Sequence, residues 1–404
     1  MDKRSGPFSV RREHAVFVYA NAGVFVDGYI LSSIGLALVT LTPQFRLDAV
    51  STGWIGAATL LGIFAGAPLF GRLTDRHGRR ILMIADLCAF VVLALAQLFV
   101  TATWELIALR FLMGVAIGAD YPIAAALVTE FWPERRRGAA LCAIETVWFV
   151  GAAVAYVAGY ALLATGPHSW KWILASPAIF AIAGLAMRAT APESPMWLAA
   201  RDAGEVAHAS FATLWQPKFR GALAFVSAMW LLQVVPLFAI YTYAPAVLTA
   251  LGLGSQSSPA GSVAITTAFA LGSLLSLPLV ERWGRRPLCI AGFAVGIPAF
   301  ALLPFVGTAG VVLCFLSYAI AIGAASGLEI VYPNELFPTQ VRGTATGFAA
   351  AVSRIGAFAG TFGLPAAIAK AGTTPIMFGA CLLSLLGFAI SWLWAPETKG
   401  RPIA

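Results

Sequence analysis

Long apolar segments, each about the length of a membrane span, make up most of this chain. A helix that crosses the hydrocarbon core of a bilayer needs about 20 apolar residues. Twelve segments meet this requirement, near residues 15–41, 51–71, 80–101, 104–132, 138–164, 170–190, 220–250, 260–281, 287–307, 309–336, 342–368 and 374–395. Because lipid offers no hydrogen bonds to the backbone, such segments are helical. We therefore predict an all-α integral membrane protein with twelve transmembrane helices.

The few charges of the chain favour a membrane protein over a nucleic-acid-binding one. Only 11% of the residues are charged, and the net charge of +8 comes from short basic clusters between apolar segments. In the twelve-span topology, 21 of the 26 Lys and Arg residues fall on the side of the two termini. Positive charge concentrates on the cytoplasmic side. We expect cytoplasmic termini, the lipid bilayer as a partner, and no nucleic acid.

The two halves of the chain repeat. The segment from Glu130 to Gly138 matches the segment from Glu335 to Gly343 at a constant offset of 205 residues. Parallel repeats of this kind are typical of transporters that bind their substrate at mid-depth between two bundles. We expect an N-terminal six-helix bundle over 1–190, a cytoplasmic linker over 191–219 and a C-terminal six-helix bundle over 220–404.

Several short motifs resemble those of a known family, the major facilitator superfamily. The motifs shared with sugar porters and their relatives are Gly71–Arg80, Pro192–Leu198 and Pro396–Gly400. The motifs that resemble bacterial metabolite:proton symporters, relatives of phosphate, aromatic-acid and nicotinate carriers, are Asp27–Tyr29, Gly118–Pro122 and Tyr332–Pro338. The resemblance implies two pseudo-symmetric bundles, an inner-membrane location, no cofactor apart from protons as the coupling ion, and a small-molecule substrate. A monomer suffices for this activity.

Three ionisable residues inside predicted spans are candidates for proton coupling. Asp27 lies roughly 22 Å and Asp120 roughly 18 Å from the cytoplasmic ends of their helices. Desolvation and a nearby cation act in opposite directions on a buried carboxylate, which can then exchange a proton near neutral pH. The resemblance to sugar:proton symporters implies that Arg110 pairs with Asp27. The alternative is a static ion pair that never titrates.

Arg354, near mid-depth in the eleventh span, is the candidate for substrate recognition. A guanidinium group binds a carboxylate through two parallel hydrogen bonds and stays charged at any working pH. The resemblance to organic-anion carriers also implies a carboxylate-binding Arg in this span. The alternative is a structural pair between Arg354 and Glu329 in the tenth span.

Aromatic and polar residues within the spans are further candidates for substrate contacts. Rings and single amides that line an apolar cleft suit a flat or compact organic solute. The set is Tyr29, Tyr121, Trp148, Trp230, Gln233, Tyr241, Tyr243, Glu329, Tyr332 and Asn334. Packing is the alternative role of each.

Charged residues near the cytoplasmic ends are candidates for gating. Networks of such charges can hold one state of a rocking carrier and break in the other. The set is Arg72, Asp75, Arg76, Arg80, Glu130, Arg137, Glu145, Glu335 and Arg342. Glu145, seven residues into the fifth span, is expected to be a shallow gate residue.

The expected function is proton-coupled uptake of a small organic anion, a carboxylate-type metabolite, by alternating access. Sugar is a weaker candidate because positions that carry hydrogen-bonding groups in sugar porters are Ala152, Leu232 and Phe238 here. The alternatives are a sugar or phosphate:proton symporter and a proton-driven exporter of drugs or organic cations. A nutrient sensor is a further alternative. We find no nucleophile constellation or metal-ligand spacing, and so expect no enzyme.

Overall fold

The computed structural model describes residues 7–132, 137–188, 193, 197–198 and 211–400. The side chains of several residues in these ranges lie outside the description, among them those of Arg72, Asp75, Arg76, Tyr121, Glu130 and Arg137. The described residues form helices and connecting turns, without strands. This agrees with the predicted all-α fold.

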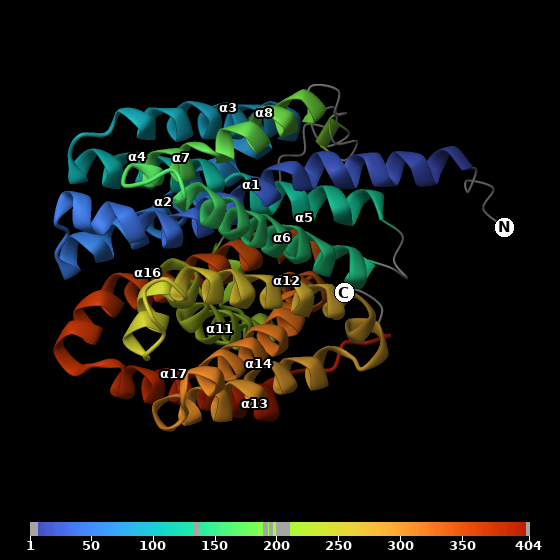
Figure 1. The fold of residues 1–404 in the computed structure, drawn as a ribbon. Coiled ribbons are helices and arrows are strands. Elements are labelled where there is room, and N and C mark those ends of the chain that lie inside the picture. Colours follow the sequence, from blue (N-terminus) through green and yellow to red (C-terminus); the bar gives the residue numbers. More distant parts are fainter. Residues whose placement is uncertain (1–6, 133–136, 189–192, 194–196, 199–210, 401–404) are drawn as a thin grey trace.

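The first half of the chain contains the helices α1 to α8. Their bounds are α1 (Pro7–Phe45), α2 (Ala49–His77), α3 (Arg79–Ala96), the 3-10 turn η1 (Gln97–Phe99), α4 (Thr103–Ile117), α5 (Asp120–Phe131), α6 (Arg137–Leu163), α7 (Ser169–Ala175) and α8 (Pro177–Arg188). Figure 1 shows them together in the upper part of the molecule.

The second half contains the helices α10 to α17, which form the lower part of Figure 1. Their bounds are α10 (Phe211–Leu214), α11 (Pro217–Ala250), α12 (Ser258–Arg282), α13 (Arg285–Leu302), the 3-10 turn η3 (Leu303–Phe305), α14 (Thr308–Ser326), α15 (Leu328–Leu336), α16 (Thr339–Ala371) and α17 (Thr373–Trp394). The halves meet where α6 packs on α12, α2 on α16 and α1 on α11. Most of the predicted linker lies outside the described residues, and its bounds stay a prediction.

Eleven helical segments of the described chain are long and apolar enough to cross a membrane. The predicted span at 104–132 is the one that differs, because it consists of two shorter helices, α4 and α5, which meet at Gly118 and Ala119. Two other predicted spans are also broken: α7 and α8 meet at Ser176, and α14 and α15 meet at Gly327. The breaks place Asp120 and Glu329 in the first turns of α5 and α15.

Glycines allow α2 and α4 to approach backbone to backbone. A Cβ atom on Gly114 would lie 2.0 Å from the Thr59 carbonyl oxygen and 2.9 Å from the Gly62 Cα atom. A Cβ atom on Gly118 would lie 2.5 Å from the Ala67 backbone nitrogen. Small residues at such spacing are typical of helix contacts in membranes, where close packing replaces the hydrophobic effect.

Two acidic residues near the ends of the halves cap two helices in the same way. The Glu193 carboxylate accepts hydrogen bonds from the backbone N–H groups of Arg79 and Arg80 at the start of α3. The Glu397 carboxylate accepts them from Arg285 and Arg286 at the start of α13. An anion at a helix N-terminus satisfies free N–H groups and the helix dipole. The capping contacts thus repeat between the halves, as the sequence motifs do.

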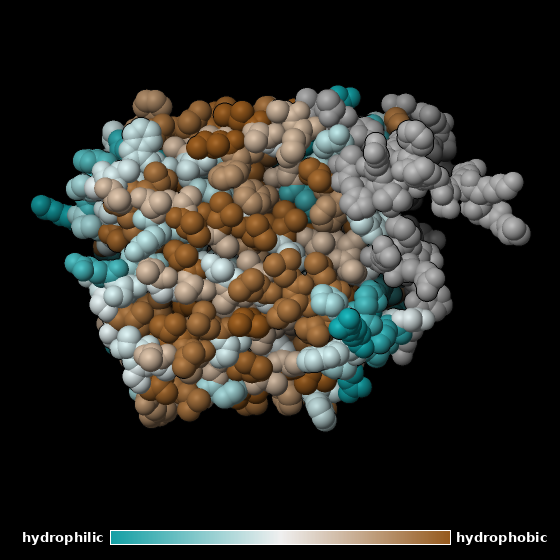
Figure 2. Space-filling model, turned by 45° about the vertical axis from the view of Figure 1, so that its right-hand side comes forward, coloured by the Kyte–Doolittle hydropathy of each residue, from teal (hydrophilic) through white to brown (hydrophobic). Residues whose placement is uncertain are grey.

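The surface of the molecule carries a broad apolar band. Figure 2 shows hydrophobic residues over the middle of one face, with hydrophilic ones gathered toward its two ends. Exposed large side chains include Val92, Ile179, Leu313 and Leu382. Because soluble proteins rarely expose a continuous apolar surface of this extent, the band is the lipid-facing surface of the helices.

Candidate functional site

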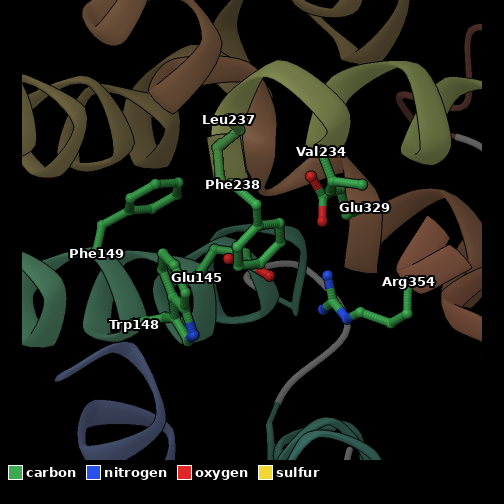
Figure 3. A pocket seen from close by; sticks show the side chains of 8 residues that line it. All are labelled: Glu145, Trp148, Phe149, Val234, Leu237, Phe238, Glu329 and Arg354. Atoms are coloured by element: carbon green, nitrogen blue, oxygen red, sulfur yellow. The ribbon is translucent and has the colours of Figure 1, made fainter. Parts of the chain in front are cut away.

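A small cavity lies between the two halves of the molecule. It encloses about 20 Å³, and it is lined by Glu145, Trp148 and Phe149 of α6, Val234, Leu237 and Phe238 of α11, Glu329 of α15 and Arg354 of α16. Figure 3 shows these side chains converging from the four helices. A space of this size holds about one water molecule, so an organic solute needs the halves to separate.

Arg354 is the cation of this cavity. Its side chain is 8% exposed, and its Nε and Nη1 atoms have no hydrogen-bond partner among the described residues. The guanidinium carbon lies 5.1 Å from the centre of the Phe238 ring, which provides a cation–π contact. Since buried charges are ordinarily paired and hydrogen-bonded, these N–H groups distinguish Arg354 from an ordinary structural arginine.

Two glutamates face Arg354 from opposite halves of the molecule. Glu145 and Glu329 are 4% and 5% exposed, and Glu145 Oε1 has no hydrogen-bond partner in the described structure. Both carboxyl groups act electrostatically on Arg354. Glu145, which was expected to be a shallow gate residue, lines this cavity together with Arg354, and its role in gating stays a prediction. Arg354 and Glu329 were the alternative, structural pair. Neither the Nε nor the Nη1 atom of Arg354 donates a hydrogen bond to Glu329 in the described structure.

A second buried charge cluster lies inside the N-terminal half, and sequence reasoning missed its centre. Arg188, at the end of α8, is fully buried. Its Nη1 atom lies 3.0 Å from Asp86 Oδ1, and its Nη2 atom lies 2.7 Å from Asp120 Oδ1. It also donates to the backbone oxygens of Tyr19, Ala20 and Met83, at 2.9, 3.1 and 2.6 Å. Arg188 thus ties α1, α3, α5 and α8 together.

The three residues expected to couple protons are not in direct contact in this conformation. Both carboxylate oxygens of Asp27 lack a hydrogen-bond partner among the described residues. Arg110 donates from Nε to the Ile55 backbone oxygen at 3.0 Å, so the pairing implied by sugar symporters is absent here. Asp120 instead pairs with Arg188. Their role in coupling stays a prediction.

The predicted substrate-binding residues divide into three groups. Arg354, Trp148 and Glu329 line the cavity. Buried polar atoms without a partner in the described structure belong to Trp230, Gln233 and Tyr241. The remaining four residues form hydrogen bonds elsewhere. The hydroxyl groups of Tyr29, Tyr243 and Tyr332 bond to Ser176, Thr52 and Pro396, respectively. The side-chain amide of Asn334 donates to the Ile330 backbone oxygen. In this conformation the polar groups of these four residues are bonded outside the cavity, and their role in substrate binding stays a prediction; Tyr121 lies outside the described side chains.

The predicted gating network is described in part. Glu335 pairs with Arg285, with Oε1 2.7 Å from Nη2, and accepts a hydrogen bond from Thr398. Arg342 donates from Nε to the Phe337 backbone oxygen at 3.1 Å, and Arg80 donates its backbone N–H to Glu193. The side chains of Arg72, Asp75, Arg76, Glu130 and Arg137 lie outside the described part. Gating therefore stays a prediction.

Polar contacts close the two halves against each other beside the cavity. The Tyr243 hydroxyl donates to the Thr52 oxygen at 3.0 Å and joins α11 to α2. The Tyr156 hydroxyl donates to the Tyr241 oxygen and joins α6 to α11. The Thr146 and Ser273 hydroxyls lie 3.0 Å apart and join α6 to α12. These bonds must break for the halves to separate.

Comparisons with known proteins identify the family. The Major Facilitator Superfamily matches residues 21–361. The inner membrane metabolite transport protein YgcS of Escherichia coli (strain K12) is 33% identical over 93% of this chain and 90% of its own length. The niacin transporter NiaP of Acinetobacter baylyi is 26% identical over 94% of this chain and 93% of its own length.

A solved structure supports the fold. The proton:xylose symporter XylE, bound to 6-bromo-6-deoxy-D-glucose, superimposes with a TM-score of 0.81 over 98% of both chains, at 19% identity. The comparisons confirm the expected family and fold, and the family is one of transporters and not of enzymes. The chain belongs to the Major Facilitator Superfamily and is a multi-pass membrane transport protein.

Proposed function

We propose that this transporter takes up a small organic anion with a carboxylate group, together with protons, by alternating access. One observation carries the proposal: Arg354 presents buried N–H groups without partners to a cavity between the halves. A site at the interface of the two repeats is exposed to each side of the membrane in turn as the bundles rock. Arg354 and Glu329 come from the C-terminal half and Glu145 from the N-terminal half.

The cavity wall suits a flat cargo. Trp148, Phe149 and Phe238 supply aromatic rings, whereas the polar lining residues are Glu145, Glu329 and Arg354 alone. A sugar needs hydrogen bonds to many hydroxyl groups, and this wall has few to give. A planar carboxylate such as nicotinate instead places its ring among aromatic side chains and its carboxylate on the guanidinium fork. The related niacin transporter NiaP makes nicotinate the natural first compound to test.

The ionisable side chains that line the cavity give a reason to couple uptake of the anion to protons. Two glutamates and one arginine carry a net negative charge when all are ionised, and a negative cavity repels an anion. Uptake with protons removes this barrier. The same two glutamates favour a second candidate, export of an organic cation, in which a positive cargo balances them. The two functions differ in the class of compound that binds, and in whether Arg354 favours or opposes its binding.

A ligand screen on purified protein tests the proposal. Thermal unfolding is measured with nicotinate, benzoate, phosphate, xylose and an organic cation such as tetraphenylphosphonium, for wild type, Arg354→Ala and Arg354→Lys. Arg282→Ala, at an exposed position at the end of α12, is the control. We expect nicotinate or benzoate to stabilise wild type and Arg282→Ala, to have little effect on Arg354→Lys, and none on Arg354→Ala. Stabilisation of every variant by a carboxylate would refute the proposal.

A further inference from the structure

We infer that Glu145 and Glu329 share one exchangeable proton, and that binding of a monocarboxylate to Arg354 adds a second proton to this pair. The inference rests on the proposed function and deepens it. It assigns the proton that enters with the cargo to the two glutamates of the cavity, one from each half of the molecule. It also fixes the stoichiometry at one proton for each monocarboxylate bound.

The geometry provides a cavity in which charge has to balance. Glu145, Glu329 and Arg354 line the same space of about 20 Å³, and each is less than a tenth exposed. An uncompensated charge in such a place is strongly unfavourable, because little water reaches it. In the empty cavity one ionised glutamate neutralises Arg354, and the other glutamate keeps its proton. The Nε and Nη1 atoms of Arg354 and the Oε1 atom of Glu145 remain without hydrogen-bond partners in the described structure.

A monocarboxylate changes this balance by one charge. When it binds Arg354, it takes the place of the ionised glutamate as the counter-ion. That glutamate is then an uncompensated anion beside a second anion, and the pair returns to neutrality by taking one proton from water. In this step the empty cavity, which is neutral, takes up one cargo anion and one proton, and the loaded cavity is therefore neutral as well. A neutral loaded cavity can be occluded between the halves without burying net charge.

Among the other ionisable groups near the two glutamates, Asp27 is the one whose ionisation bears on this count. The titratable or charged side chains that face them from α1, α6, α11, α14 and α16 are Asp27, Cys142, Tyr241, Tyr318 and Arg354. Tyrosine and cysteine side chains are ordinarily neutral at pH 7. Asp27 also acts electrostatically on Arg354, but it does not line the cavity. It is therefore the informative comparison, because the sequence predicts that it couples protons.

Calorimetry measures the proton directly. Nicotinate is titrated into wild type at pH 7.5 in two buffers that differ in ionisation enthalpy, HEPES and Tris. The difference in apparent binding enthalpy gives the number of protons taken up. We expect about one proton, and an affinity that falls about tenfold for each pH unit over the range in which the pair holds one proton in the empty carrier and two in the loaded one. Arg354-dependent binding of nicotinate without proton uptake in wild type would refute this inference.

Variants locate the proton. In the double variant Glu145→Gln/Glu329→Gln we expect nicotinate to bind without proton uptake and with little dependence on pH. Asp27→Asn and Glu105→Gln are the matched acid-to-amide comparisons, and we expect both to retain an uptake of about one proton. Size-exclusion chromatography and thermal unfolding check that the variants fold. Retained proton uptake in the double variant, or its loss in Asp27→Asn alone, would overturn the assignment.

The outcomes separate this inference from the proposed function. Carboxylate binding that is unaltered by Arg354→Ala would refute the proposed function and, with it, the inference. If the double variant fails to fold, the single variants Glu145→Gln and Glu329→Gln decide the question. In each single variant the remaining glutamate is ionised in the empty cavity and protonated in the loaded one, so both single variants are expected to keep an uptake of about one proton. Loss of proton uptake in either single variant would contradict a proton that the two glutamates share.

Discussion

The buried cluster around Arg188 allows a strong prediction about stability. Arg188→Met keeps most of the side-chain volume but removes the counter-charge of Asp86 and Asp120, both of which are at most 2% exposed. Breaking a buried ion pair by removal of one partner costs about 3–5 kcal/mol. For a unit of about 190 residues, such as the predicted N-terminal bundle, this corresponds to a melting temperature lower by roughly 6–20 °C.

The reasoning also predicts a rescue. The cost arises from two carboxylates that are left buried without a cation, so neutral replacements should remove most of it. We expect the triple variant Asp86→Asn/Asp120→Asn/Arg188→Met to melt well above Arg188→Met. Differential scanning fluorimetry in one detergent is the assay, and Arg282→Met at an exposed position is the control. Wild-type melting of Arg188→Met, or no recovery in the triple variant, would refute the account of this cluster.

Two further predictions concern packing and a helix cap. Gly114→Ala should lower the melting temperature, because its Cβ atom would lie 2.0 Å from the Thr59 oxygen, whereas Gly379→Ala, which meets nothing within 4 Å, should not. Burial opposes ionisation of Glu397, but backbone N–H groups outweigh it and hold the pKa of this carboxyl below its usual range. The stabilisation is therefore present above the unfolded pKa of about 4.3 and lost as the pH falls through the lower folded pKa. Thermal melts from pH 7 to pH 3 should show Glu397→Gln less stable than wild type at pH 7, with a difference that becomes smaller as the pH falls below the unfolded pKa.

The fold was predicted well from the sequence, because a chain segment that crosses lipid has few backbone conformations open to it. The requirement for about 20 apolar residues with internally satisfied backbone groups located the spans. The same requirement did not locate the helix breaks at Gly118, Ser176 and Gly327. A straight helix and a broken one can have the same pattern of apolar residues. The spacing of the glycines at 114 and 118 is typical of close helix packing, and both positions lie against α2.

The site was predicted in part. Arg354 stood out because an arginine in the middle of an apolar segment is costly and needs a reason. The sequence did not predict that Glu145 shares a cavity with Arg354, because the distance along one helix gives depth, but not which side chains of the other half reach that depth. Arg188 did not stand out in the sequence, since an arginine in the last turn before a polar stretch ordinarily anchors a span at the cytoplasmic side. Its carboxylate partners come from α3 and α5, and this proximity depends on tertiary packing.

The most direct test of the account is proton-driven uptake in proteoliposomes. Radiolabelled nicotinate is supplied outside vesicles whose interior is more alkaline than the medium, with wild type, Arg354→Ala and Arg282→Ala. The account predicts accumulation by wild type and Arg282→Ala that a protonophore abolishes, and no accumulation by Arg354→Ala. Accumulation by wild type that ignores the pH gradient, or a preference for organic cations that survives in Arg354→Ala, would contradict it.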